Sequence, residues 1–255
     1  MNREIVKQKM KELLDVDTKS LNMRLPIALG KTQDGMICFR DLTSLHHLLI
    51  AGAAGQGKTS CLNGMIASLS KSSHWPEIVS ISAKGMYELC HSNTIPLAKT
   101  EHWDAMYTLE KLNKEVEIRL KLFKEEGVRT LEEYQEKYMD YITLRYMVVI
   151  IDDYDHLILS LSPNYKHKMF GLIVNLAQKG SQVGVHLIIT TQKITYDIIS
   201  GCLMANFPAR IAFRVDKEYE SRMILYQAGA EKLDGIGKLI FSYYDEFFQL
   251  QGILT

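Results

Sequence analysis

The sequence has few cysteines and no excess of charge of either sign. Its four cysteines, Cys38, Cys61, Cys90 and Cys202, are far apart and form no C-x-x-C pair. This pattern argues against a zinc site and against a disulfide framework, and it favours a reducing, cytoplasmic setting. Thirty basic residues balance thirty acidic ones. The chain therefore has no overall electrostatic field that would attract nucleic acid or anionic lipid.

Long apolar runs are also missing from the start of the chain. The stretch MNREIVKQKMKELL is charged along its length, so we expect neither a signal peptide nor a membrane span there. Its apolar residues recur at helical spacing, which predicts an amphipathic helix over residues 2–14. A linker follows, so residues 1–24 are expected to form an N-terminal helix and linker. At 255 residues, the chain is long enough for one large α/β domain or for two small ones.

The strongest local pattern is LLIAGAAGQGKTSCLN at residues 48–63. Apolar residues predict a buried strand, small residues follow, and helix-compatible residues begin at Lys58. The spacing G-x-x-x-x-G-K-S/T is that of a P-loop, in which backbone N–H groups and a helix N-terminus surround a phosphate. The expected nucleotide-binding positions are Gly52, Ala53, Ala54, Gly55, Gln56, Gly57, Lys58, Thr59 and Ser60.

Two of these residues have side-chain roles in a P-loop. Lys58 would reach the β- and γ-phosphates of ATP, and the Thr59 hydroxyl would be a ligand of Mg²⁺. ATP and Mg²⁺ are therefore the predicted cofactors. The alternative is a glycine-rich turn that binds nothing. The eight-residue pattern and its flanking strand and helix together favour nucleotide binding.

Two further predicted strands end in polar residues. YMVVIIDD, at residues 146–153, has the form of a Walker B strand, in which Asp152 would hold the Mg²⁺ shell and Asp153 would orient the attacking water. HLIITTQ ends at Gln192, whose amide could sense the γ-phosphate. A lone glutamine could equally cap the following turn. Because ligands collect at the carboxyl ends of parallel strands, we expect these groups at one edge of the sheet.

The rest of the chain alternates between predicted helices and hairpins. Helical spacing extends over residues 101–126, Gly127 ends that helix, and a second short helix is expected at residues 131–138. Residues 25–42 read as a hairpin that leads into the P-loop strand, and residues 238–254 read as a closing hairpin.

The chain resembles the motor domain of the FtsK/SpoIIIE family of hexameric double-stranded DNA translocases. The resemblance lies in HHLLIAGAAGQGKTSCLN, VVIIDDYDHL, GVHLIITTQ and DIISGCLMANFPARIAFRVDKEYESRMILYQAGAEKLDGIGKLIF. It implies a RecA-like P-loop NTPase fold for residues 25–255, with a mostly parallel central sheet, flanking helices and a C-terminal β-hairpin. It also implies ATP bound between subunits of a homo-oligomeric, hexameric ring, and double-stranded DNA in the pore.

Carried over residue by residue, the resemblance makes Lys58, Asp152, Asp153 and Gln192 the catalytic set. It adds Arg119, which matches the place of an arginine able to reach a neighbour's nucleotide. The alternative for Arg119 is a solvated charge on a long helix. Where the family usually has Asp-Glu, this chain has Asp152-Asp153, so the second carboxylate is one methylene shorter. A displacement of about 1 Å at a catalytic group can cost on the order of a hundredfold in rate.

The resemblance leaves several functions open. The first is an ATP-driven translocase of double-stranded DNA, as a minimal motor, a fragment or a stand-alone relative from a conjugative or mobile element. The second is the ATPase subunit of a protein-secretion system, and the third is a slowly hydrolysing ATP-binding regulatory subunit. The expected location is the cytoplasm, with attachment to the inner face of the cell membrane through partner proteins as an open alternative.

Overall fold

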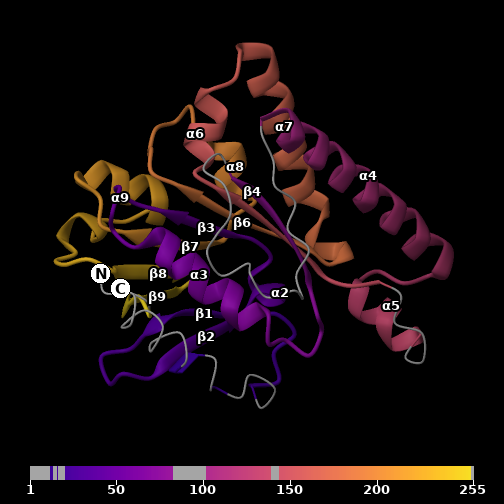
Figure 1. Cartoon of the computed structure of the whole chain (residues 1–255), viewed down its shortest axis with the longest axis horizontal. Helices are drawn as coiled ribbons and strands as arrows, with labels where there is room; N and C mark the ends of the chain where they lie inside the picture. The colour runs from indigo at the N-terminus through magenta and orange to yellow at the C-terminus, as the bar shows by residue number, and fades with distance from the viewer. Residues whose placement is uncertain (1–11, 14–15, 17–20, 83–101, 139–143, 254–255) are drawn as a thin grey trace.

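A nine-stranded sheet forms the centre of the protein, with strand order β2-β1-β9-β8-β7-β3-β6-β5-β4 (Figure 1). The structure is a computed structural model that describes residues 12–13, 16, 21–82, 102–138 and 144–253. Helices cover the sheet, and the α4–α5 pair extends away from it on one side (Figure 1). The predicted α/β class is confirmed.

Five strands are parallel and form one side of the sheet. Every residue of β3, β5, β6 and β7 is buried, which is the pattern of strands covered on both faces. This explains why these strands read as continuous apolar runs. The parallel strands are β3 (Leu48–Ala51), β4 (Glu77–Ser82), β5 (Met147–Asp152), β6 (Val185–Thr191) and β7 (Ala209–Phe213).

The other four strands form two antiparallel hairpins, and both predicted hairpins are confirmed. They are β1 (Pro26–Lys31) with β2 (Ile37–Asp41), and β8 (Lys238–Tyr243) with β9 (Glu246–Gln251). The hairpins meet where Lys31 pairs with Gln251. A Cβ at Gly30 would lie 2.7 Å from the Gln251 carbonyl oxygen, so this approach requires glycine. The sheet was expected to be mostly parallel. Antiparallel pairing instead joins β1 to β2 and β9, and β8 to β7 and β9.

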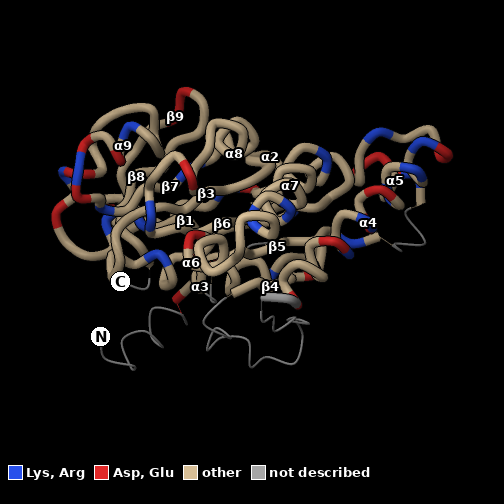
Figure 2. Tube along the Cα trace, turned by 90° about the horizontal axis from the view of Figure 1, so that it is seen from above, with Lys and Arg blue, Asp and Glu red and all other residues tan. Residues whose placement is uncertain are grey.

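Two long helices pack against each other and lie side by side in Figure 1. Asn113 of α4 donates to the Leu172 carbonyl of α7 (3.1 Å) and accepts from Asn175 (2.6 Å). Glu110 and Glu117 of α4 form ion pairs with lysines of α7. Basic and acidic residues are interspersed along α4 and α5 (Figure 2). These helices are α4 (His102–Glu126) and α7 (Pro163–Lys179).

The remaining helices are shorter. The predicted helix at residues 131–138 is confirmed as α5. The full set is α2 (Leu42–Leu45), α3 (Lys58–Leu69), α5 (Leu131–Lys137), α6 (Tyr154–Leu159), α8 (Gly201–Ala205) and α9 (Glu218–Leu225), with 3₁₀ turns η3 (Ser181–Val183) and η4 (Ala230–Lys232).

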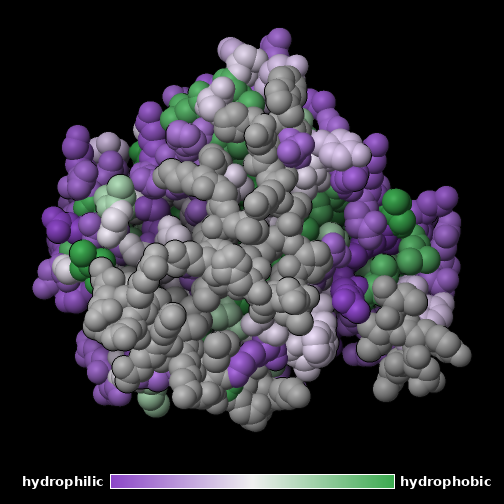
Figure 3. Space-filling model, viewed as in Figure 1, coloured by the Kyte–Doolittle hydropathy of each residue, from purple (hydrophilic) through white to green (hydrophobic). Residues whose placement is uncertain are grey.

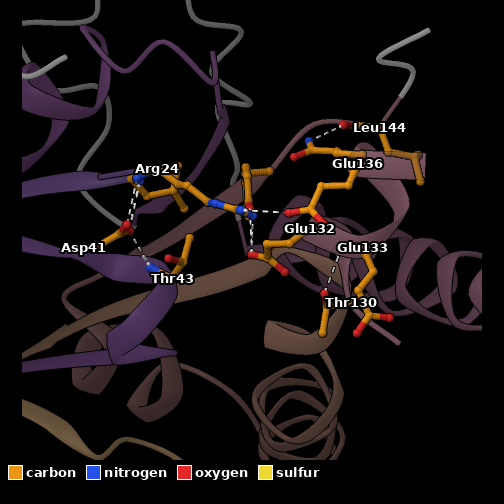
Figure 4. Close-up of polar contacts among 11 residues, drawn as sticks. Arg24, Asp41, Thr43, Thr130, Glu132, Glu133, Glu136 and Leu144 are labelled. Atoms are coloured by element: carbon orange, nitrogen blue, oxygen red, sulfur yellow. Dashed lines mark hydrogen bonds and ion pairs between the residues drawn. The ribbon is translucent and has the colours of Figure 1, made fainter. Parts of the chain in front are cut away.

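A polar network fastens α5 to the body of the protein (Figure 4). Thr130 caps the helix by accepting from the Glu133 N–H (3.2 Å). Glu132 forms an ion pair with Arg24 (3.3 Å) and accepts from the hydroxyl of Tyr146 (2.6 Å). The backbone N–H of Arg24 donates in turn to Asp41 (2.7 Å). Arg24 thus joins α5 to the first hairpin.

The predicted N-terminal helix lies outside the described residues except for Glu12 and Leu13, which are helical. Leu13 is buried in a small apolar cluster with Ala28, Phe39, Ala67 and Ile253. Within the part of the chain that the structure describes, no helix combines the length and apolar character that crossing a membrane requires. On the face shown in Figure 3, hydrophilic residues line most of the outline and hydrophobic residues form small separate patches.

Candidate functional site

The P-loop lies between β3, which ends at Ala51, and α3, which begins at Lys58. Gly52 has φ +149°, and a Cβ there would lie 2.7 Å from the Phe213 Cβ. Only glycine fits this first turn of the loop. No side chain caps the N-terminus of α3, so its first N–H groups face the loop and are suited to an anion.

Lys58 lies across this loop. Its ammonium group is buried and donates to the carbonyl oxygens of Gly52 (2.7 Å) and Ala53 (2.8 Å). Thr59, the next residue, is exposed. The arrangement places a cation within the loop and leaves a hydroxyl accessible beside it, as a P-loop requires.

Two backbone contacts hold the loop in place. The Ala53 N–H donates to the carbonyl of Arg214, just beyond β7 (2.9 Å), and the Gly237 N–H donates to the carbonyl of Gln56 (3.0 Å). Burial raises the pKa of the nearby Cys61 thiol to about 12. Cys61 therefore stays a neutral thiol and is not a nucleophile at this site.

The two acids end β5 and contact the neighbouring strand β6. Asp152 accepts from the Thr190 hydroxyl through Oδ1 (2.5 Å), and the same hydroxyl accepts from the Asp153 N–H (2.9 Å). Asp153 Oδ1 accepts from Gln192 Nε2 (2.5 Å). Both acids are about 7% exposed. The structure thus brings three of the predicted catalytic residues, Asp152, Asp153 and Gln192, into one network.

A third acid, Asp155, joins this network and was not anticipated from the sequence. Its Oδ1 accepts from the Thr191 hydroxyl (3.1 Å) and from the Gln192 N–H (3.0 Å). Asp155 therefore holds the backbone of Gln192 against the start of α6. The signal available in the sequence was a third carboxylate in DDYD and a pair of threonines before the glutamine.

The P-loop strand and the strands that carry these residues are direct neighbours. β3 pairs in parallel with β6, with Ala51 opposite Thr191, and β6 pairs in parallel with β5. The P-loop, the acids and Gln192 therefore all follow the carboxyl ends of adjacent parallel strands. This is the edge at which open α/β sheets bind ligands.

The residues at this edge fit a Mg²⁺ ion held together with phosphate. Mg²⁺ prefers oxygen ligands, retains several waters, and is bound through one or two protein groups plus substrate phosphates. Thr59 supplies an accessible hydroxyl. Asp152 supplies a carboxylate whose Oδ1 is engaged by Thr190.

The structure overturns the alternative reading of Arg119 as a solvated charge, and its role toward a neighbouring subunit stays a prediction. Its side chain is buried, and its guanidinium donates to the carbonyls of Arg145 (2.8 Å) and Val183 (3.1 Å) and to Glu115 (2.7 Å). These partners lie at the start of β5 and at η3 before β6, the opposite edge from the P-loop. Arg119 therefore ties α4 to the sheet of its own chain.

The sequence profile of the FtsK/SpoIIIE family matches residues 11–196, and the match includes the P-loop, both acids and Gln192. The chain belongs to the FtsK/SpoIIIE family. It is 38% identical over 240 residues to a DNA translocase FtsK of Borreliella burgdorferi and 36% identical over 259 residues to the DNA translocase SpoIIIE of Bacillus subtilis. These matches cover 90% and 94% of this chain but only 30% and 32% of the relatives. The chain therefore spans about a third of the length of these family members.

Solved structures share the fold. The pCW3 conjugation coupling protein TcpA, in a structure with ATPγS, superposes with a TM-score of 0.80 at 25% identity, covering 92% of this chain and 68% of that one. The cytoplasmic domain of the type VII secretion ATPase EccC of Thermomonospora curvata superposes with a TM-score of 0.76 at 19% identity, covering 94% and 30%. At that lower identity the likeness concerns the fold.

Proposed function

We propose that the chain is an ATP-driven motor that translocates double-stranded DNA. The observation that carries the proposal is the shared edge: the phosphate loop, two acids and a sensing amide follow adjacent parallel strands in a member of the FtsK/SpoIIIE family. Its relatives are named DNA translocases.

The site residues then divide the work of phosphoryl transfer, which is mainly positioning and charge stabilisation. Lys58 and the N–H groups of the loop bind the phosphates. Thr59 and Asp152 hold Mg²⁺, which when bound neutralises charge on the phosphate oxygens. Asp153 orients the attacking water. Gln192 contacts Asp153 directly, and this contact links the state of the γ-phosphate to the acid.

We further propose that the chain works as a homo-oligomeric ring of six subunits, as its resemblance to the hexameric FtsK/SpoIIIE motors implies. Nucleotide would bind between neighbouring subunits, and a cation other than Arg119 would complete the site from the next subunit. DNA would occupy the pore, with the motor in the cytoplasm. Residues 25–255 would form the motor, and residues 1–24 would dock a helix and linker on its outside.

The test is ATP hydrolysis by the purified chain with and without linear double-stranded DNA, at two salt concentrations, with Lys58→Ala as the control. Contacts to DNA phosphates weaken as salt rises, so we expect DNA to stimulate hydrolysis at low salt and less at high salt. Lys58→Ala should abolish ATP hydrolysis both with and without DNA. Hydrolysis that DNA leaves unchanged at both salt concentrations would refute the DNA-driven motor and favour the secretion or regulatory function.

A further inference from the structure

The hydroxyl of Thr190 sits between the two acids of the site. Thr190 belongs to β6, is completely buried, and pairs with Ile50 of the P-loop strand. Its Oγ1 lies 2.5 Å from Asp152 Oδ1 and 2.9 Å from the backbone nitrogen of Asp153. One side-chain atom of β6 therefore contacts both consecutive acids.

The direction of each hydrogen bond follows from the groups involved. A backbone N–H only donates, so Oγ1 accepts from Asp153. An ionised carboxylate only accepts, so the hydroxyl proton points at Asp152 Oδ1. The hydroxyl of Thr190 therefore has a fixed orientation. It forms a hydrogen bond with one of the two carboxylate oxygens of Asp152. In the proposed site, Oδ2 would be the oxygen of Asp152 that serves the Mg²⁺ shell.

The second contact holds a strained turn. Asp153 has φ +51° and ψ +48°, in the left-handed region. Residues with a Cβ adopt this conformation uncommonly, and it persists where the surrounding structure enforces it. The bond from the Asp153 N–H to Thr190 is a restraint of this kind. The turn in turn carries the Asp153 carboxylate to Gln192.

We propose that Thr190 is the positioning residue that sets both acids in register with the phosphate loop, and this inference rests on the proposed ATPase function. The Thr190 hydroxyl contacts Asp152 and Asp153, and its role is exercised through these two residues. It acts through Asp152 by fixing which oxygen serves Mg²⁺, and through Asp153 by fixing the turn that aims the shorter carboxylate. A short side chain has less reach to correct a misplaced backbone, so this chain depends on that restraint.

The test compares Thr190→Val with Thr190→Ser in the full chain. Valine keeps the shape of threonine and lacks the hydroxyl, whereas serine keeps the hydroxyl and lacks the methyl. ATP turnover is measured over a range of Mg²⁺ concentrations, and nucleotide affinity is measured separately with a fluorescent non-hydrolysable ATP analogue. Thermal melts verify that each variant is folded. Thr190→Ala removes the same hydroxyl with less disturbance and carries the test if the valine variant does not fold.

We expect Thr190→Val to lower kcat by about 10- to 100-fold, the usual cost of losing a group that orients a metal ligand. The Mg²⁺ concentration for half-maximal turnover should rise, nucleotide affinity without Mg²⁺ should stay unchanged, and Thr190→Ser should retain wild-type turnover. The role of Thr190 would be refuted if the wild type hydrolyses ATP and Thr190→Val has the same kcat. It would also be refuted if Thr190→Ser loses as much kcat as Thr190→Val. A folded wild type that binds nucleotide and hydrolyses none would instead refute the proposed function.

Discussion

Replacing Arg119 with alanine should destabilise the chain itself. The side chain is about 5% exposed, so water screens its contacts little. Alanine would leave the carbonyls of Arg145 and Val183 without their donor and Glu115 without its cation. Hydrogen bonds to a charged group contribute about 1.5–3 kcal/mol each. With partial access of water to the vacated site, we expect a loss of about 3–5 kcal/mol.

Thermal unfolding followed by circular dichroism measures this loss. For a chain of this size about 1 kcal/mol shifts the midpoint by about 2–4 °C, so the Arg119→Ala midpoint should fall by roughly 10 °C. Arg119→Lys is the matched variant, because it keeps the charge but has no planar fork for two carbonyls. The midpoint of Arg119→Lys should fall less than that of Arg119→Ala and should still lie below that of the wild type.

A subunit-mixing assay separates this structural role from action on a neighbouring subunit. In a mixture of Arg119→Ala and Lys58→Ala chains, some interfaces combine an intact Lys58 with an intact Arg119. If Arg119 served the neighbour's nucleotide, those interfaces would hydrolyse ATP and the mixture would exceed both parents. We expect no such gain. A wild-type melting midpoint for Arg119→Ala together with regained activity in the mixture would refute the reasoning.

Two further predictions test the loop and the buried histidines. Gly52→Ala should lower nucleotide affinity in a binding titration, because the added Cβ meets Phe213 at 2.7 Å, whereas Gly171→Ala in α7 meets nothing within 4 Å and should bind as wild type. Burial lowers the pKa of His47 to about 3 and of His186 to about 4, so stability is full above the unfolded-state pKa of about 6.5 and declines as pH falls toward those values. Urea unfolding at pH 7 and pH 5 should show this decline, and His186→Leu should make it shallower. If His186→Leu loses as much stability between pH 7 and pH 5 as the wild type, the assignment of this pH dependence to His186 is contradicted.

Some of this site could be predicted because its signals are local. The P-loop requires glycines at fixed offsets beside a strand and a helix, and all of these lie within one short stretch from Leu48 to Asn63. A buried strand that ends in acids is similarly local, so Asp152 and Asp153 could be found by reading along the chain. The fold class followed from the same alternation of apolar strands and helices.

The partners of these residues could not be found in the same way. Thr190 contacts Asp152 across 38 positions, and Gln192 contacts Asp155 across 37. These contacts depend on which strands lie side by side, and the linear pattern does not specify that order. The same limit applies to the sheet: each hairpin can be predicted from its turn, but the meeting of Lys31 with Gln251 depends on tertiary packing. The burial of Arg119 could not be predicted either, because the sequence pattern of a helical charge is the same whether the side chain faces water or a neighbouring carbonyl.

The structure shows how the short side chain of Asp153 still reaches Gln192. Compared with glutamate, aspartate loses one methylene of reach, yet Asp153 contacts Gln192 at 2.5 Å. Two features make that contact possible. Asp153 lies in a left-handed turn just before α6, and Asp155, in the first turn of α6, accepts from the backbone N–H of Gln192. Thr190 thus anchors the turn at Asp153, and Asp155 anchors the backbone of Gln192, so both partners of this contact are restrained. A change at either anchor should therefore affect hydrolysis more than nucleotide binding.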